Sequence, residues 1–145
     1  MRIDGEWLEC LDGDTRPIIR AEILLDDGNW FEFSLLVDTG ADRTVLSADV
    51  LRASHLRLAG DLRPIGGLGG IVACEIVKTQ LRFRRDDGVQ VAVRGEFAAL
   101  IEPEALDMSV LGRDVLDMFA LIVDRSHDVV AILGGQHRYN ITRTS

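Results

Sequence analysis

The sequence predicts a mostly β fold with one or two short helices. Along much of the chain, apolar and polar residues alternate with a period of two, and three turn-like segments each separate two such stretches. A period of two belongs to strands, because a helix would repeat about every 3.6 residues. The length of 145 residues suits one compact domain, so we treat residues 1–145 as a single domain.

Three β-hairpins are expected in chain order. Each consists of two alternating stretches around a turn: 19–25 and 31–37 around 26–29, 77–83 and 89–97 around 86–88, and 119–124 and 129–133 around 125–128. The first two turns contain Asp-Gly, which is typical of tight hairpin turns.

Helical patterns are short. Residues Ser47–His55 fit one or two turns with Ser47 as the N-cap, and Arg113–Met118 fit another short helix. Residues 1–16 and 138–145 lack a clear pattern. We therefore expect them to be extensions of a core that spans about residues 18–133.

The chain is acidic. It has 16 Lys and Arg residues against 24 Asp and Glu residues, which gives a formal net charge of −8. Negative charge opposes binding to phosphate backbones and anionic lipids. The longest apolar runs are also far shorter than the ~20 residues that a membrane-spanning helix needs. We therefore expect neither nucleic acid nor a membrane as a partner.

The cysteines and histidines suggest a compartment and argue against a metal. The N-terminus lacks a basic start followed by an apolar stretch, so no signal peptide is expected. Two cysteines, Cys10 and Cys74, then favour a cytoplasmic location with free thiols, although one disulfide stays an alternative. The histidines, His55, His127 and His137, show no metal-ligand spacing. We expect no metal and no cofactor.

The most informative segment is Asp38-Thr39-Gly40. It directly follows Leu35–Val37, which has the apolar character of a buried strand. Glycine permits a sharp backbone turn, and the threonine hydroxyl can hold that turn by a hydrogen bond. The residues themselves leave two interpretations open: a structural turn, or a catalytic carboxylate at a strand end.

A glycine-rich segment follows at Ile65-Gly66-Gly67-Leu68-Gly69-Gly70. Such a segment predicts a mobile hairpin tip whose backbone can approach a ligand closely. A phosphate-binding loop is disfavoured, because neither a Gly-Lys-Ser/Thr ending nor a helical pattern follows the glycines. A plain surface loop stays an alternative.

A third segment, Ser109–Asp114, repeats the apolar-apolar-x-x context of Leu36–Gly40. This weak internal duplication is expected if the domain has two related halves.

Together the three segments resemble the retropepsin-like family of aspartic proteases, which contains the retroviral proteases. The resemblance covers about Ile18–Leu133 and implies a closed β-barrel of the acid-protease fold, equivalent to half of a pepsin-like enzyme. Leu36–Ala41 resembles the catalytic strand end, Ile65–Gly70 the flap tip, and Val110–Asp114 the segment before the C-terminal helix. The strand pair within 119–133 resembles cellular and bacterial members more than viral ones.

The resemblance implies a homodimeric aspartic endopeptidase that acts on peptides or proteins. Each chain would supply one Asp38, with Thr39 hydrogen-bonding across the dimer and Gly40 offering its carbonyl to the substrate. Further substrate contacts would come from Ala41, Asp42 and the flap residues Ile65, Gly66, Gly67, Leu68, Gly69 and Gly70. Structural support would come from Leu111, Gly112 and Arg113.

Two alternative functions accompany this interpretation. The fold could serve as a dimerisation or peptide-binding module with little or no catalysis. A single-chain pepsin-like enzyme would need a second Asp-Thr/Ser-Gly, which this sequence lacks.

The resemblance also implies an ion pair between Asp42 and Arg113, which could be partly buried and costly to break, or exposed and weak.

Overall fold

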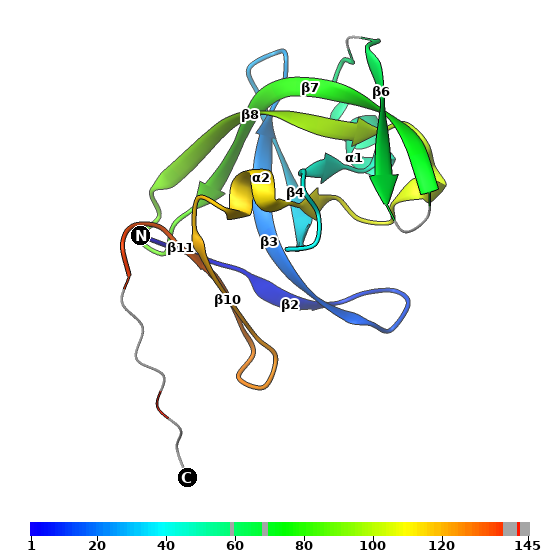
Figure 1. The fold of residues 1–145 in the computed structure, drawn as a ribbon. Helices are drawn as coiled ribbons and strands as arrows, with labels where there is room; N and C mark the ends of the chain where they lie inside the picture. Colours follow the sequence, from blue (N-terminus) through cyan, green and yellow to red (C-terminus); the bar gives the residue numbers. More distant parts are fainter. Residues whose placement is uncertain (59, 68–69, 138–141, 143–145) are drawn as a thin grey trace.

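The computed structural model describes residues 1–58, 60–67, 70–137 and 142. Its strands are β1 (Arg2–Asp4), β2 (Glu6–Glu9), β3 (Thr15–Leu24), β4 (Trp30–Val37), β5 (Val45–Leu46), β6 (Leu62–Gly67), β7 (Gly70–Arg84), β8 (Gln90–Leu100), β9 (Val110–Leu111), β10 (Ala120–Asp124) and β11 (Val129–Leu133). Its helices are α1 (Ala48–Ser54), α2 (Arg113–Leu116) and the 3-10 helix η1 (Pro103–Ala105). The mostly β prediction is confirmed (Figure 1).

All three predicted hairpins form. β3 pairs antiparallel with β4, β7 with β8, and β10 with β11. Gly28 and Gly88 adopt φ values of +86° and +83° in the first two turns, a conformation that side chains with a Cβ rarely adopt. The alternation of the sequence therefore translates directly into strand pairing.

Most of the strands close into a ring around the core. The large sheet has the order β2-β3-β4-β9-β5-β8-β7-β6, and an additional β3–β7 pairing joins its two halves (Figure 1). At this junction Arg82 donates two hydrogen bonds to the Glu22 carboxylate, at 2.7 and 2.9 Å, and lies over the Trp30 ring. These bonds lower the pKa of Glu22. Inside the ring, the largest side chains with no exposed surface include Ile19, Ile23, Leu35, Leu81 and Phe83.

The N-terminal residues belong to both sheets, contrary to the expectation that residues 1–16 form an extension. β1 pairs with β11, and β2 pairs with β3. Ile3 is fully buried, and a Cβ on Gly5 would lie 2.2 Å from the Ile18 carbonyl oxygen. Strands of three and four residues are too short to show alternation in a sequence. The other predicted extension, 138–145, lies outside the described residues apart from Thr142.

Both predicted helices are present and short. α1 begins after Ser47, as predicted, but the Ser47 side chain does not cap it. Instead, the Ser47 N–H donates to the Ser109 hydroxyl at 2.9 Å, which ties the start of α1 to the start of β9. α2 ends at Leu116, two residues earlier than predicted. No helix in the described part of the chain is long and apolar enough to cross a membrane.

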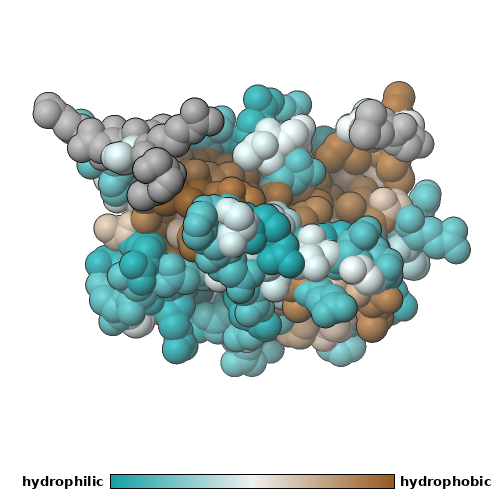
Figure 2. Space-filling model, turned by 90° about the horizontal axis from the view of Figure 1, so that it is seen from below, coloured by the Kyte–Doolittle hydropathy of each residue, from teal (hydrophilic) through white to brown (hydrophobic). Residues whose placement is uncertain are grey.

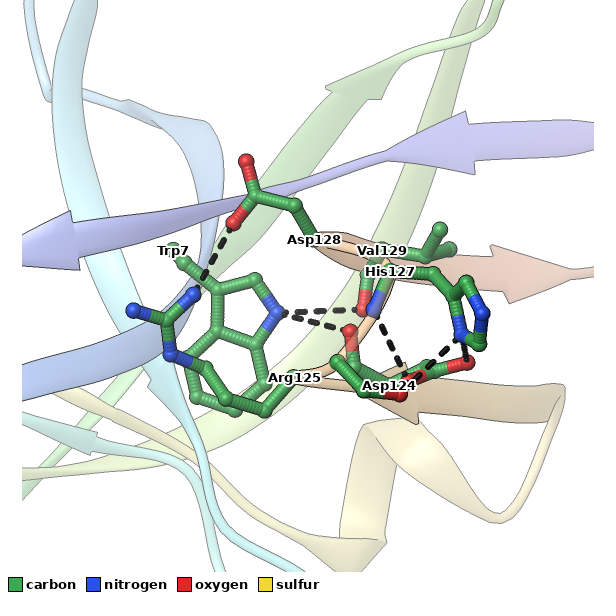
Figure 3. A network of polar contacts seen from close by, with 7 residues as sticks. Trp7, Asp124, Arg125, His127, Asp128 and Val129 are labelled. Atoms are coloured by element: carbon green, nitrogen blue, oxygen red, sulfur yellow. Dashed lines mark hydrogen bonds and ion pairs between the residues drawn. The ribbon is translucent and has the colours of Figure 1, made fainter.

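The β10–β11 turn is fastened to β2 by a tryptophan (Figure 3). The Trp7 indole N–H donates to the carbonyl oxygens of Asp124 and Val129, at 3.2 and 3.3 Å, while Arg125 lies over the ring. Within the turn, the Asp124 carboxylate accepts hydrogen bonds from the Ser126 hydroxyl and the His127 backbone N–H. Contacts with Ser126 and His127 lower the pKa of Asp124 to about 2.

This turn should make the stability of the fold depend on acidity. Because the pKa of Asp124 is lower in the folded chain than its ordinary value of 3.8, its carboxylate stabilises the fold above that value. The contribution is lost as the pH falls through about 2. We expect Asp124→Asn to lower the melting temperature near neutral pH, with the difference shrinking in acid. Melting curves of both proteins across pH test this, and a pH-independent difference would contradict it.

Candidate active site

Asp38 lies where β4 ends, in the middle of the large sheet. β4 runs parallel to β9, with Val37 opposite Leu111, and the Asp38 N–H donates to the Leu111 carbonyl at 3.2 Å. One carboxylate oxygen of Asp38 accepts the Gly40 N–H at 2.9 Å. Asp38 is partly exposed, whereas Thr39 and Gly40 are exposed. The turn thus presents an oriented carboxylate at the surface of the chain.

The loop that follows Asp38 is held by a buried threonine. β9 lies between β4 and β5, so residues 38–44 cross over it. Thr44 has no exposed surface, and both its N–H and its hydroxyl donate to Asp114, at 2.8 and 2.7 Å. The Thr44 hydroxyl also accepts the Gly112 N–H at 3.1 Å. Neither Thr44 nor Asp114 was predicted as a site residue, although Asp114 belongs to the Gly-Arg-Asp segment that carries part of the resemblance.

The start of α2 forms the other support of this loop. The N–H groups of Arg113 and Asp114 donate to the carbonyls of Ala41 and Asp42, at 2.8 and 3.2 Å. Gly112 is buried so tightly that a Cβ there would lie 2.3 Å from the Arg43 carbonyl carbon. Leu111 is fully buried beneath the loop. These contacts place Leu111, Gly112 and Arg113 beside the Asp38 loop.

Asp42 and Arg113 form the ion pair that the resemblance implied. The Asp42 side chain is 78% exposed and that of Arg113 is 50% exposed, so the exposed alternative is the correct one in the single chain. The contact with Asp42 raises the pKa of Arg113. Exposed pairs of this kind contribute little to stability, because water screens both charges.

The glycine-rich segment forms the end of the β6–β7 hairpin. Gly66 pairs with Ile71 and Gly67 with Gly70, which has a φ of +106°. Leu68 and Gly69, which the sequence predicted at the tip, lie outside the described residues. Gly66, Gly67 and Gly70 therefore lie at the end of a hairpin.

The hairpin and the Asp38 loop meet over one apolar cluster. Its buried members are Val45, Cys74, Ala98, Leu100 and Val110. Ala41, from the Asp38 loop, and Ile65, from β6, both pack against it. Two segments more than twenty residues apart in the sequence thus pack against the same cluster.

A small pocket opens between these two segments. It has a volume of about 110 Å³ and is lined by Arg43, Arg63, Pro64, Ile65, Cys74 and Ile76. A larger hollow of about 510 Å³ lies away from the site, where Leu24, Lys78 and Glu96 are among its lining residues. Because the larger hollow includes none of the predicted site residues, we assign the site to the smaller pocket and the Asp38 loop.

Apolar side chains are exposed on the underside of the molecule. Figure 2 views that side, toward which β6 and the β10–β11 turn point in Figure 1, and shows a band of apolar surface. β10 is an edge strand, and its Ile122 and Val123 are 39% and 42% exposed. An edge strand with exposed apolar side chains can accept another strand or chain.

In the described part of the chain, no group of three or more His, Cys, Asp or Glu residues could hold a metal ion.

A comparison with models of protein families found one that matches most of this chain. Residues 13–123 match the family model described as retroviral aspartyl protease. The chain belongs to this family. A search of curated proteins found no significant match.

Comparison with solved structures found distantly similar chains. A retropepsin-like aspartic protease from Rickettsia conorii is 19% identical, with a TM-score of 0.59 over 90% of this chain and 98% of the other. EIAV protease bound to an inhibitor is 24% identical, with a TM-score of 0.46 over 74% of this chain and 91% of the other. The predicted retropepsin fold is confirmed, while the roles of the individual site residues stay predictions.

Proposed function

We propose that this chain is one half of a homodimeric aspartic endopeptidase. The observation that carries the proposal is the Asp38 carboxylate, which the Gly40 N–H orients in an exposed turn at the end of β4. The sequence contains one Asp-Thr-Gly, so a pair of such carboxylates requires two chains. Membership in the retroviral aspartyl protease family supports this assignment.

In the proposed mechanism the two Asp38 carboxyl groups lie about 3 Å apart and share one proton, because both cannot be charged at that distance. The ionised group takes a proton from a water molecule between them, and the protonated group donates to the scissile carbonyl oxygen. The water oxygen then bonds to the carbonyl carbon. When the carbon–nitrogen bond breaks, the leaving nitrogen receives a proton from the pair.

The substrate in this proposal is an extended peptide. It would lie between the Asp38 loop and the β6–β7 hairpin, with main-chain hydrogen bonds along its length and side chains directed alternately to either side. Closure of Ile65–Gly70 over the peptide would exclude water from the reacting groups. Ala41, which packs beside Ile65 on the same cluster, would then line the floor of the site.

Dimerisation needs a surface that overcomes charge repulsion, since each chain carries a net charge of −8. The apolar band of Figure 2 and the unpaired edge of β10 are suited to that purpose. As the compartment we propose the cytoplasm, because Cys10 and Cys74 are both free thiols.

Two measurements test the proposal together. Sedimentation at micromolar concentration is expected to show a dimer, and a mixture of peptides incubated with the protein at about pH 4 to 7 is expected to be cleaved internally. A stable monomer that cleaves peptides would contradict the shared site. A dimer that binds peptides without cleaving any would favour the alternative, a peptide-binding module.

A further inference from the structure

The pocket beside the Asp38 loop carries two arginines, and we propose that it selects an acidic side chain in the peptide substrate. This inference rests on the proposed function, because it treats the pocket as part of the substrate site. Arg43 and Arg63 would be specificity-determining residues, and both would bind the carboxylate of the same Asp or Glu side chain.

The position of the pocket supports this role. Arg43 lies on the loop that leads from Asp38 to β5, whereas Arg63, Pro64 and Ile65 lie on β6, which leads into the glycine-rich hairpin. A peptide held between that loop and that hairpin would therefore pass the mouth of the pocket. The volume of about 110 Å³ suits one short side chain.

The charges around the pocket leave at least one guanidinium available. Among the residues that the structure describes, no carboxylate lies within ion-pair distance of Arg43, which is exposed. Arg63 contacts Asp61 at 3.3 Å, but both side chains are more than half exposed, at 54% and 64%. An exposed pair of this kind exchanges readily for a better-placed carboxylate.

Two other acids lie near the arginines, and both have partners of their own. Glu75, which is 8% exposed, accepts the Gly60 N–H at 3.0 Å. Glu96 pairs with Lys78 at 3.0 Å, and its pKa is lowered mainly by Lys78 and further by the charges of Arg63 and Arg43. Burial raises the pKa of the Cys74 thiol on the pocket floor, while Arg43 and Arg63 act in the opposite direction. Both guanidinium groups thus project their positive charge into the same small space.

Arginine suits a carboxylate better than lysine would, because its planar fork can donate two parallel hydrogen bonds. Ile65, Ile76 and Cys74 supply an apolar wall for the methylene groups of Asp or Glu. In a chain with a net charge of −8, a locally positive pocket is also a strong basis for discrimination. A neutral Asn or Gln side chain would fill the same space without the charge.

The first experiment maps cleavage sites in a peptide mixture by mass spectrometry. We expect Asp or Glu to be enriched at one fixed distance from the cleaved bond. At that position, a Glu peptide should exceed its Gln counterpart in kcat/KM by about tenfold. The double variant Arg43→Gln/Arg63→Gln should bring the ratio to about one. The matched control is Arg52→Gln on α1, outside the pocket, which should keep the wild-type ratio.

A second experiment separates this inference from the proposed function. The same mixture is passed over immobilised Asp38→Asn protein, and the retained peptides should be rich in Asp and Glu unless both arginines are also replaced. Cleavage without an acidic preference would overturn the inference and leave the proposed function standing. Absence of cleavage with selective acidic retention would overturn the function alone, whereas retention without acidic enrichment would overturn the inference.

Discussion

Asp38→Asn is expected to abolish peptide hydrolysis while leaving the fold intact. Asparagine can neither take a proton from water nor share one with a second carboxyl group. General acid and base catalysis by such a pair is worth at least a hundredfold in rate, so we expect kcat to fall by about a thousandfold or more. The measurement is turnover of a peptide identified in the cleavage assay.

The fold should survive because the local contact at Asp38 survives. One carboxylate oxygen accepts the Gly40 N–H, and the amide oxygen of asparagine can accept the same hydrogen bond. Circular dichroism and the melting temperature should therefore match those of the wild type. Asp49→Asn, an exposed aspartate on α1 that pairs with Arg52, is the matched control and should keep full activity.

Mixing the two proteins tests whether the site is shared between chains. If equal amounts of wild-type and Asp38→Asn chains exchange freely, about one quarter of the dimers carry two aspartates, whereas independent sites would leave about one half active. Activity near one quarter of the value for wild-type dimers at the same total concentration supports the dyad. Activity near one half, or retained activity in the pure variant, would show that Asp38 does not act in this way.

The features that could be predicted from the sequence are local ones. The first two hairpins join strands that are adjacent in the chain, so alternation around an Asp-Gly turn was sufficient to predict them. The Asp-Thr-Gly motif, the glycine-rich segment and the Gly-Arg-Asp segment are each contiguous in the chain, so they were sufficient to locate the candidate site. Even the pairing of Asp42 with Arg113, 71 residues apart, was predicted from the resemblance. The resemblance left open whether the pair is buried or exposed.

The features that could not be predicted depend on distant pairings. β5 and β9 have two residues each, too few for a pattern, and yet their place between β4 and β8 positions Asp38. The bond from Thr44 to Asp114 spans 70 residues and joins a threonine and an aspartate that look ordinary in sequence. β1 and β2 acquire their role only by pairing with β11 and β3. Tertiary context, not local propensity, decides such elements.

Gly112→Ala is expected to damage both stability and activity. A Cβ at this position would lie 2.3 Å from the Arg43 carbonyl carbon and 2.8 Å from the Thr44 nitrogen, so backbone must move to admit it. Overpacking of this kind typically costs about 1–3 kcal/mol in the free energy of unfolding. Because the displaced loop also carries Asp38, a shift of about 1 Å should lower kcat/KM by about a hundredfold in the protein that still folds.

Urea unfolding measures the first effect, and peptide turnover per folded chain measures the second. Gly66→Ala is the matched control for stability, because a Cβ there would meet nothing within 4 Å. We expect its free energy of unfolding to equal that of the wild type. An alanine at position 112 that left both stability and turnover unchanged would show that α2 does not support the Asp38 loop.

A double-mutant cycle with Thr44→Val tests that support more directly. Valine keeps the shape of Thr44 but removes the oxygen that accepts the Gly112 N–H and the hydroxyl that donates to Asp114. The buried Gly112 N–H would lose its partner, whereas Asp114 would keep the Thr44 backbone N–H at 2.8 Å, and the loss should cost about 1–3 kcal/mol. Gly112→Ala displaces the same backbone, so the double variant should already have incurred part of this cost. Its loss in the free energy of unfolding should therefore be smaller than the sum of the two single losses. Strictly additive losses would mean that Thr44 and Gly112 stabilise the fold independently, and the loop would then owe its position to β9 alone.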